Sequence, residues 1–123
     1  MTVIKSQGWV QSSCWDNSKL IEELYKKRCK KEVEEMTSHK QAASFLTKQS
    51  HVKDTLLDVG CGSGYFYHSL KKQNLNLDYF GIDSSKKLIG IGKKYMTNYG
   101  LSSKQLVNMR LEDVSQNFDH IVC

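Results

Sequence analysis

TLLDVGCGSGYF, at residues 55–66, combines a short apolar run, a glycine-rich turn and the start of a helical pattern. The apolar run, Thr55 to Val59, is too short for a core helix, so it predicts a strand buried on both faces, as in a parallel sheet. Glycine is needed where the backbone takes a positive φ or approaches a ligand closely, and three glycines follow at alternate positions: Gly60, Gly62 and Gly64. Residues 65–72 then resume a helical spacing. Strand, glycine turn and helix together predict a cradle for a negative or polar group.

Downstream of this turn, three further apolar runs predict strands at residues 78–83, 105–109 and 118–123. A helical pattern at residues 85–98 lies between the first two of them. Strands that alternate with helices predict an α/β fold with a parallel sheet of about four strands and helices on both faces. Ligands bind such sheets at the carboxyl ends of the strands, where the candidate residues lie: Asp58, the three glycines, Asp83, Glu112 and Asp113.

The first 50 residues lack this alternation and instead predict helices. Apolar residues recur at helical spacing from residue 18 to about 36, after a cap at Asp16 or Asn17, and Ser38 can cap a second helix. These helices are either scaffold or a wall on the substrate side. We expect a single domain over residues 1–123, with a helical segment at 1–50 and an α/β core at 51–123.

Asp83 ends the second predicted strand and lies 19 residues after Gly64. In nucleotide-binding βαβ units, an acid about 20 residues beyond the turn meets the ribose hydroxyls. A carboxylate suits that role because it accepts hydrogen bonds from both hydroxyls. The alternative is that Asp83 caps the next helix, but Ser84 and Ser85 can do that themselves. We therefore expect Asp83 to be free for a ligand.

The whole motif, Asp58-Val-Gly60-Cys61-Gly62-Ser-Gly64, resembles the first motif of the class I S-adenosylmethionine-dependent methyltransferases. It is most similar to the small-molecule methyltransferases that carry D-V-G-C-G-S-G. Further along, Phe118-Asp-His-Ile-Val122 is similar to the start of the family's fourth strand, so the resemblance covers about residues 50–123. It implies a Rossmann-like sheet in the strand order 3-2-1-4 and S-adenosylmethionine as the cofactor.

The resemblance also implies roles for single residues. The turn from Gly60 to Gly64, Cys61 included, would lie against the methionine part of the cofactor, with Asp58 near its amino group. Asp83 would bind the ribose hydroxyls, and Ser84 would lie alongside the adenine.

At the adenine edge the chain departs from the family. An acid followed by a small residue is common there, whereas this chain has Arg110 and Leu111. The resemblance then leaves the adenine contact to Glu112 or Asp113, or to the backbone N–H of Leu111.

No catalytic residue and no metal site is identified in the sequence. Methyl transfer from a sulfonium is a direct displacement, so the protein mainly aligns the acceptor and excludes water. A general base is needed only where the acceptor must lose a proton. His68, Asp119 and His120 are weak candidates, because the first lies on a helix face and the others start a strand. We expect the catalytic residue to be missing from this chain.

Length is the larger departure from the family, whose sheet usually has seven strands. This chain stops on the fourth, and it has no proline and so no N-P-P-Y type motif. We expect the N-terminal half of a methyltransferase, either truncated or completed by another chain. The fourth strand would then be an uncovered apolar edge, which predicts a homo-oligomer or poor solubility.

Charge and composition limit the partners. The net charge is +5, and residues 1–53 hold ten Lys and Arg against six Asp and Glu. A nucleic-acid partner is an alternative that we do not favour, because acids are interleaved with these bases and no aromatic pattern accompanies them. Four scattered cysteines, no signal-peptide core and no apolar run near the roughly 20 residues of a membrane span predict a cytoplasmic protein with no membrane partner.

The sequence therefore predicts a methyltransferase that acts on a small molecule, or less readily on RNA or protein. A non-catalytic cofactor-binding fragment or subunit is the first alternative. A fragment of an NAD(P)-binding oxidoreductase is the second, disfavoured because the turn reads G-x-G-x-G rather than G-x-G-x-x-G.

Overall fold

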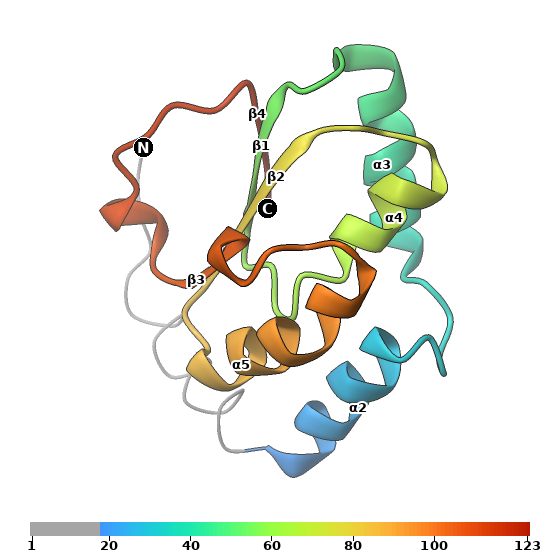
Figure 1. Cartoon of the computed structure of the whole chain (residues 1–123), viewed down its shortest axis with the longest axis vertical. Helices are drawn as coiled ribbons and strands as arrows, with labels where there is room; N and C mark the ends of the chain where they lie inside the picture. The colour runs from blue at the N-terminus through green and yellow to red at the C-terminus, as the bar shows by residue number, and fades with distance from the viewer. Residues whose placement is uncertain (1–17) are drawn as a thin grey trace.

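A computed structural model describes residues 18–123 of the chain, so the caps predicted at Asp16 and Asn17 lie outside the described residues. Helices and strands alternate from residue 55 onward, as the sequence predicts (Figure 1). The elements are α2 (Lys19–Cys29), α3 (Thr37–Gln49), β1 (Thr55–Val59), α4 (Phe66–Lys72), β2 (Asp78–Asp83), α5 (Lys86–Tyr95), η1 (Met96–Tyr99), η2 (Ser103–Gln105), β3 (Leu106–Asn108), η3 (Leu111–Asp113) and β4 (His120–Val122), where η marks a 3-10 helix.

The four strands form one parallel sheet in the order β3-β2-β1-β4, which confirms the predicted parallel α/β sheet and its strand order. β1 lies in the middle and pairs with β2 along its whole length. Its central residues Leu56, Leu57 and Asp58 are all buried, as a strand with both faces covered requires. The carboxyl ends of β1 and β2 therefore lie at the same edge of the sheet. The glycine turn follows β1 at this edge.

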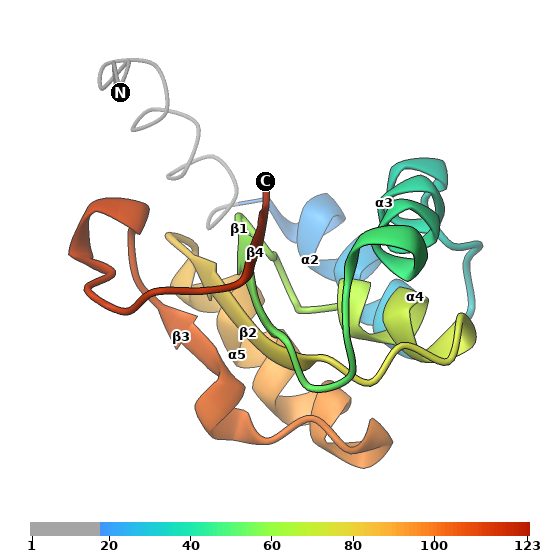
Figure 2. The ribbon, with the colours of Figure 1, turned by 90° about the horizontal axis from the view of Figure 1, so that it is seen from above.

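Register assigns the side chains of β1 and β2 to two faces. Leu56 is opposite Tyr79, and both belong to the main core cluster with residues of α2, α3, α4 and α5. Figure 2 shows these helices gathered to one side of the strands, so the expectation of helices on both faces is wrong for the described residues. On the other face Leu57 is opposite Phe80, whose ring lies 6.1 Å from that of Phe118 in the segment that leads into β4.

The first helix is shorter than its apolar pattern predicts. α2 ends at Cys29 rather than near residue 36, and Lys31 adopts a left-handed φ of 62°. Cys29 is fully buried, and its thiol donates a hydrogen bond to the Ser63 hydroxyl in the glycine turn. The helix ends in a turn in which the N–H groups of Lys31 and Glu32 donate to the carbonyls of Arg28 and Lys27, although the apolar pattern alone would continue it.

Two predicted helix starts change as well. Ser18 caps α2, because its side chain accepts a hydrogen bond from the backbone N–H of Ile21. α3 begins at Thr37 after Met36, with no side-chain cap, so the prediction of a cap at Ser38 is wrong.

The remaining bounds are close to those predicted. The helical pattern at residues 85–98 forms α5 and η1, and Gly100 ends it in the left-handed region with φ 96°. The third and fourth strands have three residues each and are shorter than the predicted runs. Ile121 on the edge strand β4 is 56% exposed.

Candidate functional site

The glycine turn lies at the carboxyl edge of the sheet and has the backbone conformation that its sequence predicts. Gly60, Gly62 and Gly64 have φ values of 71°, 59° and 84°. The backbone N–H groups of Gly60 and Cys61 donate to the carbonyl of Ile82 at 2.9 and 3.0 Å. The end of β2 thus holds the start of the turn in place.

The three glycines face different surroundings. A Cβ at Gly62 would lie 2.5 Å from the ring of Tyr25, and one at Gly64 would lie 2.7 Å from the side chain of Leu106. A Cβ at Gly60 would meet nothing within 4 Å. Gly62 and Gly64 therefore allow the protein to pack on the turn, whereas Gly60 leaves the backbone open to a ligand.

Asp83 at the end of β2 joins the turn to α5. One carboxylate oxygen accepts from the backbone N–H of Gly62 and the other from that of Ser85, each at 2.8 Å. The prediction that Asp83 is free is therefore wrong in this respect, although the Ser85 hydroxyl does cap α5 by accepting from the N–H of Leu88. A carboxylate has about four acceptor positions, so Asp83, which is half-buried, keeps capacity for two hydroxyl groups.

Asp58 lies inside the protein, beneath the turn. It is 7% exposed, and its carboxyl group accepts a hydrogen bond of 2.6 Å from the hydroxyl of Tyr79. Burial raises the pKa of Asp58 to about 7, the Tyr79 hydrogen bond opposes this rise, and the charge of Asp83 adds to it. Burial also raises the pKa of the Cys61 thiol, so that this cysteine is an inert, neutral side chain.

Two side chains of α2, Tyr25 and Arg28, also reach the site, and sequence reasoning did not identify them. Tyr25 lies against Gly62, and burial raises the pKa of its hydroxyl. The guanidinium carbon of Arg28 lies 5.3 Å from the centre of the Tyr25 ring. Within residues 18–123 the Arg28 Nε is buried without a hydrogen-bond partner. The i,i+3 spacing puts the two side chains on one helix face, but only the fold places that face on the turn.

The residues predicted near the adenine follow β2 and β3 at the same edge. Ser84 is exposed, directly after Asp83. The other three, Leu111, Glu112 and Asp113, form η3, in which Leu111 is half-buried and the two acids are exposed.

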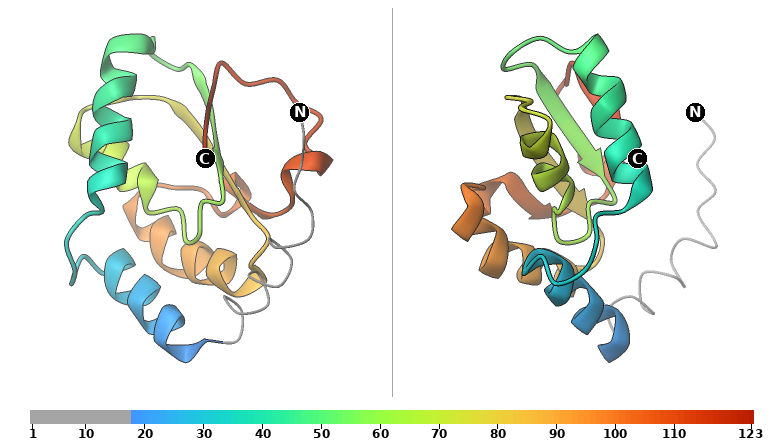
Figure 3. Two further views of the ribbon diagram at one scale, coloured as in Figure 1. Left: turned by 180° about the vertical axis from the view of Figure 1, so that it is seen from behind. Right: turned by 90° about the vertical axis from the view of Figure 1, so that its right-hand side faces the viewer.

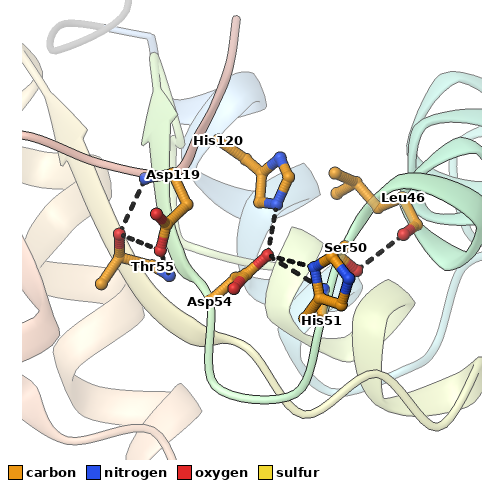
Figure 4. Close-up of polar contacts among 7 residues, drawn as sticks. All are labelled: Leu46, Ser50, His51, Asp54, Thr55, Asp119 and His120. Atoms are coloured by element: carbon orange, nitrogen blue, oxygen red, sulfur yellow. Dashed lines mark hydrogen bonds and ion pairs between the residues drawn. The ribbon is translucent and has the colours of Figure 1, made fainter.

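Asp119 and His120 lie at the opposite, amino edge of the sheet (Figure 4). The Asp119 carboxylate accepts from the backbone N–H and the hydroxyl of Thr55 at 2.8 and 3.1 Å, and the Thr55 hydroxyl accepts from the N–H of Asp119. The Nε2 of His120 lies 2.8 Å from a carboxylate oxygen of Asp54, which also accepts from the N–H of His51. These contacts tie β4 to the start of β1.

His68, the third weak base candidate, lies in α4 and is 5% exposed. Its ring meets that of Tyr99 edge to face at 4.3 Å. Burial lowers the pKa of His68 to about 4, and the charges of Lys31 and Lys72 lower it further. His68 is therefore a neutral core side chain near neutral pH.

Residues 18–123 contain neither a cluster of metal ligands nor a membrane-spanning helix. No three or more His, Cys, Asp or Glu side chains come together as metal ligands there. No helix in the same residues has the length and apolar character to cross a membrane.

Comparison with known sequences identifies methyltransferases. The family model described as "Methyltransferase domain" matches residues 57–123. A tRNA (guanine-N(7)-)-methyltransferase of Mycoplasma capricolum subsp. capricolum is 37% identical over 57 residues, which are 46% of this chain and 26% of that protein. The enzyme of the same name from Mycoplasma mycoides subsp. mycoides SC is 33% identical over 70 residues, 52% of this chain and 32% of that protein. The chain thus matches about a quarter to a third of the length of these curated relatives.

Solved structures share the fold at low sequence identity. The magnesium protoporphyrin IX methyltransferase of Synechocystis PCC 6803 with bound SAM superposes with a TM-score of 0.69 and 12% identity, over 100% of this chain and 64% of that one. A putative S-adenosyl-L-methionine-dependent methyltransferase of Methanococcus maripaludis has a TM-score of 0.53 and 22% identity, over 63% and 35% of the two chains.

Proposed function

This chain belongs to the methyltransferase domain family, and from that premise we propose that it binds S-adenosylmethionine at the carboxyl edge of its sheet and serves in methyl transfer. The observation that carries the proposal is the pairing of an open backbone at Gly60 with a half-buried carboxylate at Asp83. Both belong to the described residues, and the Gly62 hydrogen bond to Asp83 fixes them relative to each other.

The residues present fit the polar groups of this cofactor. Asp83 has acceptor capacity for two ribose hydroxyls, and the turn beside Gly60 has room for the amino-acid part. Arg28, with its buried and unpartnered Nε, supplies a cation for the carboxylate of that part. Asp58, buried beneath the turn, would lie near the amino group of the same part of the cofactor. For the adenine we propose these neighbours: Ser84, Leu111, Glu112 and Asp113.

The described residues bind and orient rather than take protons. The cofactor, when bound, supplies a methyl group on a sulfonium and so brings its own leaving group. Tyr25 covers the turn at Gly62 and excludes water from that side. Asp119 and His120 are held at the far edge, and His68 is buried, so we assign no general base.

The acceptor is proposed only by class. A small molecule is the first candidate, on the similarity of the Asp58 to Gly64 motif to small-molecule methyltransferases. RNA is the second, because both curated relatives are named tRNA methyltransferases. Since the chain spans only part of these relatives, cofactor binding without transfer is the third proposal.

Calorimetric titration with S-adenosylmethionine and its demethylated product tests the cofactor site. We expect Asp83→Ala to weaken binding at least tenfold, about 1.4 kcal/mol. Asp83→Asn keeps one carbonyl oxygen, and with it one of the two hydrogen bonds from the N–H groups of Gly62 and Ser85, so it should weaken binding with less effect on folding than Asp83→Ala. Asp119→Ala is the matched control at the amino edge and should bind as the parent does. No binding at millimolar cofactor would overturn the proposal for this chain.

A further inference from the structure

A cluster of lysines and tyrosines covers the surface where the ends of α2, α4 and α5 meet η1. Each lysine amine lies over a tyrosine ring, at 4.6 to 5.6 Å from its centre. Tyr95 carries two lysines, Lys30 from α2 and Lys94 from α5. We call this surface the lysine–tyrosine face and define it by Lys30, Lys31, Lys71, Lys94, Tyr67, Tyr95 and Tyr99.

The lysine–tyrosine face is continuous. The His68 ring lies between Tyr67 and Tyr99, at 6.5 and 4.3 Å from their ring centres. Tyr95 precedes Tyr99 by four residues at the junction of α5 and η1. α2 and α5 lie side by side in Figures 1 and 3, which brings Lys30 and Lys31 to the same place. Three separate stretches of the chain thus build one surface.

Acids are scarce on this side of the molecule. Residues 84–111 hold six Lys and Arg and no Asp or Glu, and residues 59–77 hold two lysines and no acid. Ion pairs join Lys26, Lys72 and Lys87 to Glu22 or Glu35. Within residues 18–123 no such pair involves a lysine of the lysine–tyrosine face. The loop after α2 adds three acids, Glu32, Glu34 and Glu35, and the last of these is paired with Lys72.

Four lysines held over aromatic rings and not neutralised by acids suit a chain of regularly spaced negative charges. A lysine that rests on a ring has lost part of its rotamer freedom, so less entropy is lost when it meets an anion. A membrane surface fits less well, since apolar side chains would have to enter it. The exposed large apolar residues of the described chain lie elsewhere: Leu20, Leu24, Met36, Phe45, Val52 and Ile121.

We propose that the lysine–tyrosine face binds the phosphodiester backbone of a nucleic acid. It is separate from the candidate cofactor site, because α5 starts beside Asp83 and ends at Tyr95, ten residues or about 15 Å away. Binding there requires neither cofactor nor methyl transfer. RNA and DNA share the phosphodiester chemistry, and the test distinguishes them.

Fluorescence anisotropy with a fluorescein-labelled 30-nucleotide RNA hairpin, and with the DNA hairpin of the same sequence, tests the proposal on the full chain. Four phosphate contacts predict an affinity that falls roughly 100-fold between 50 and 200 mM salt. We expect Lys30→Glu with Lys31→Glu, and separately Lys71→Glu with Lys94→Glu, to weaken binding at least tenfold. Tighter binding of one hairpin would identify the preferred nucleic acid.

Lys48→Glu with Lys104→Glu is the matched control, since it makes the same charge change at two exposed lysines outside the face. It should keep most of the affinity. Equal losses in the control and the face variants would show unspecific attraction and overturn the proposal. So would binding of the face to vesicles of 30% phosphatidylserine without binding of either hairpin. Unfolding midpoints and titration with S-adenosylhomocysteine, both expected to be unchanged in all variants, separate this result from loss of the fold or of the cofactor site.

Discussion

The two edges of one sheet use the same kind of residue in opposite ways. At the amino edge, Asp54 and Asp119 are held by His120 and Thr55, and these contacts tie β4 to β1. At the carboxyl edge, Asp83 is held by backbone N–H groups alone, next to a glycine turn that is open at Gly60. The acids of the amino edge bind side chains as well as backbone N–H groups and so link β4 to β1, whereas Asp83 binds backbone N–H groups only and lies beside the open turn.

The pKa values of the acids at the two edges also shift in opposite directions. Burial raises the pKa of Asp58, under the glycine turn, to about 7. At the other edge the backbone hydrogen bond from His51, followed by the contact with His120, lowers the pKa of Asp54. The two carboxyl groups lie four residues apart, Asp54 directly before β1 and Asp58 inside it, so their surroundings and not the local sequence decide the direction of the pKa shift.

The largest effect is expected where α5 packs on the glycine turn. A Cβ at Gly92 would lie 2.3 Å from the backbone carbonyl oxygen of Ser63, which cannot move without the turn. We expect Gly92→Ala to cost about 3 kcal/mol of the free energy of unfolding. Gly90→Ala, on the same helix with nothing within 4 Å, should instead stabilise by up to about 1 kcal/mol. Urea unfolding of both variants checks this, and equal effects would contradict it.

The next largest effect on stability is expected from Asp58→Asn. Since the folded state binds this proton more tightly than the unfolded chain, Asp58 makes the protein less stable as pH rises from about 4 to about 7. The rise of its pKa from 3.8 to about 7 limits the resulting loss in free energy of unfolding to about 4 kcal/mol. We expect roughly half of that loss. The variant should therefore be the more stable protein at pH 8. Unfolding titrations from pH 4 to 8 measure it, and parallel curves for both proteins would refute it.

A smaller effect is expected from Asp119→Ala at the amino edge. The variant loses the hydrogen bonds to the backbone and hydroxyl of Thr55, at a cost of about 1 kcal/mol. Cofactor affinity should not change, because the contact lies at the other end of the strands. Chemical unfolding and calorimetry together check this. A tenfold loss of cofactor affinity would show that the two edges are coupled.

The smallest effect, and one of opposite sign to that of Asp58, is expected from Asp54→Asn. Because the pKa of Asp54 is lowered in the folded state, its contribution to stability is present above pH 3.8 and is lost as pH falls through the lowered value. The parent should be the more stable protein at pH 6, and the difference should vanish in strong acid. Acid-unfolding curves followed by circular dichroism measure this. A difference that grows toward low pH would contradict it.

Much of the fold could be predicted because its signals are local. The apolar run at β1, the alternate glycines and the acid at the end of β2 each follow from a few neighbouring residues, and the structure confirms β1 and β2 at their predicted bounds. The end of α2 could not be predicted from the apolar pattern, which continues past the point where Lys31 takes a left-handed φ and ends the helix. The expectation that Asp83 is free failed because its partner Gly62 is 21 positions distant, beyond the reach of a local pattern.

The sequence by itself determined a parallel α/β sheet, its strand order through a family resemblance, and a ligand edge marked by glycines and Asp83. These follow from side-chain periodicity and from the positive φ that glycine allows. Only the tertiary structure decided that Tyr25 covers Gly62. It also supplied the aromatic partners that the basic N-terminal residues lack in sequence, by placing Lys30 over Tyr95 and Lys31 over Tyr99. The physical reason is that the residues in contact are far apart in sequence: Tyr25 and Gly62 by 37 positions, and the two lysines and their tyrosines by more than 60, so that the lysines meet the rings only when α2 packs on α5.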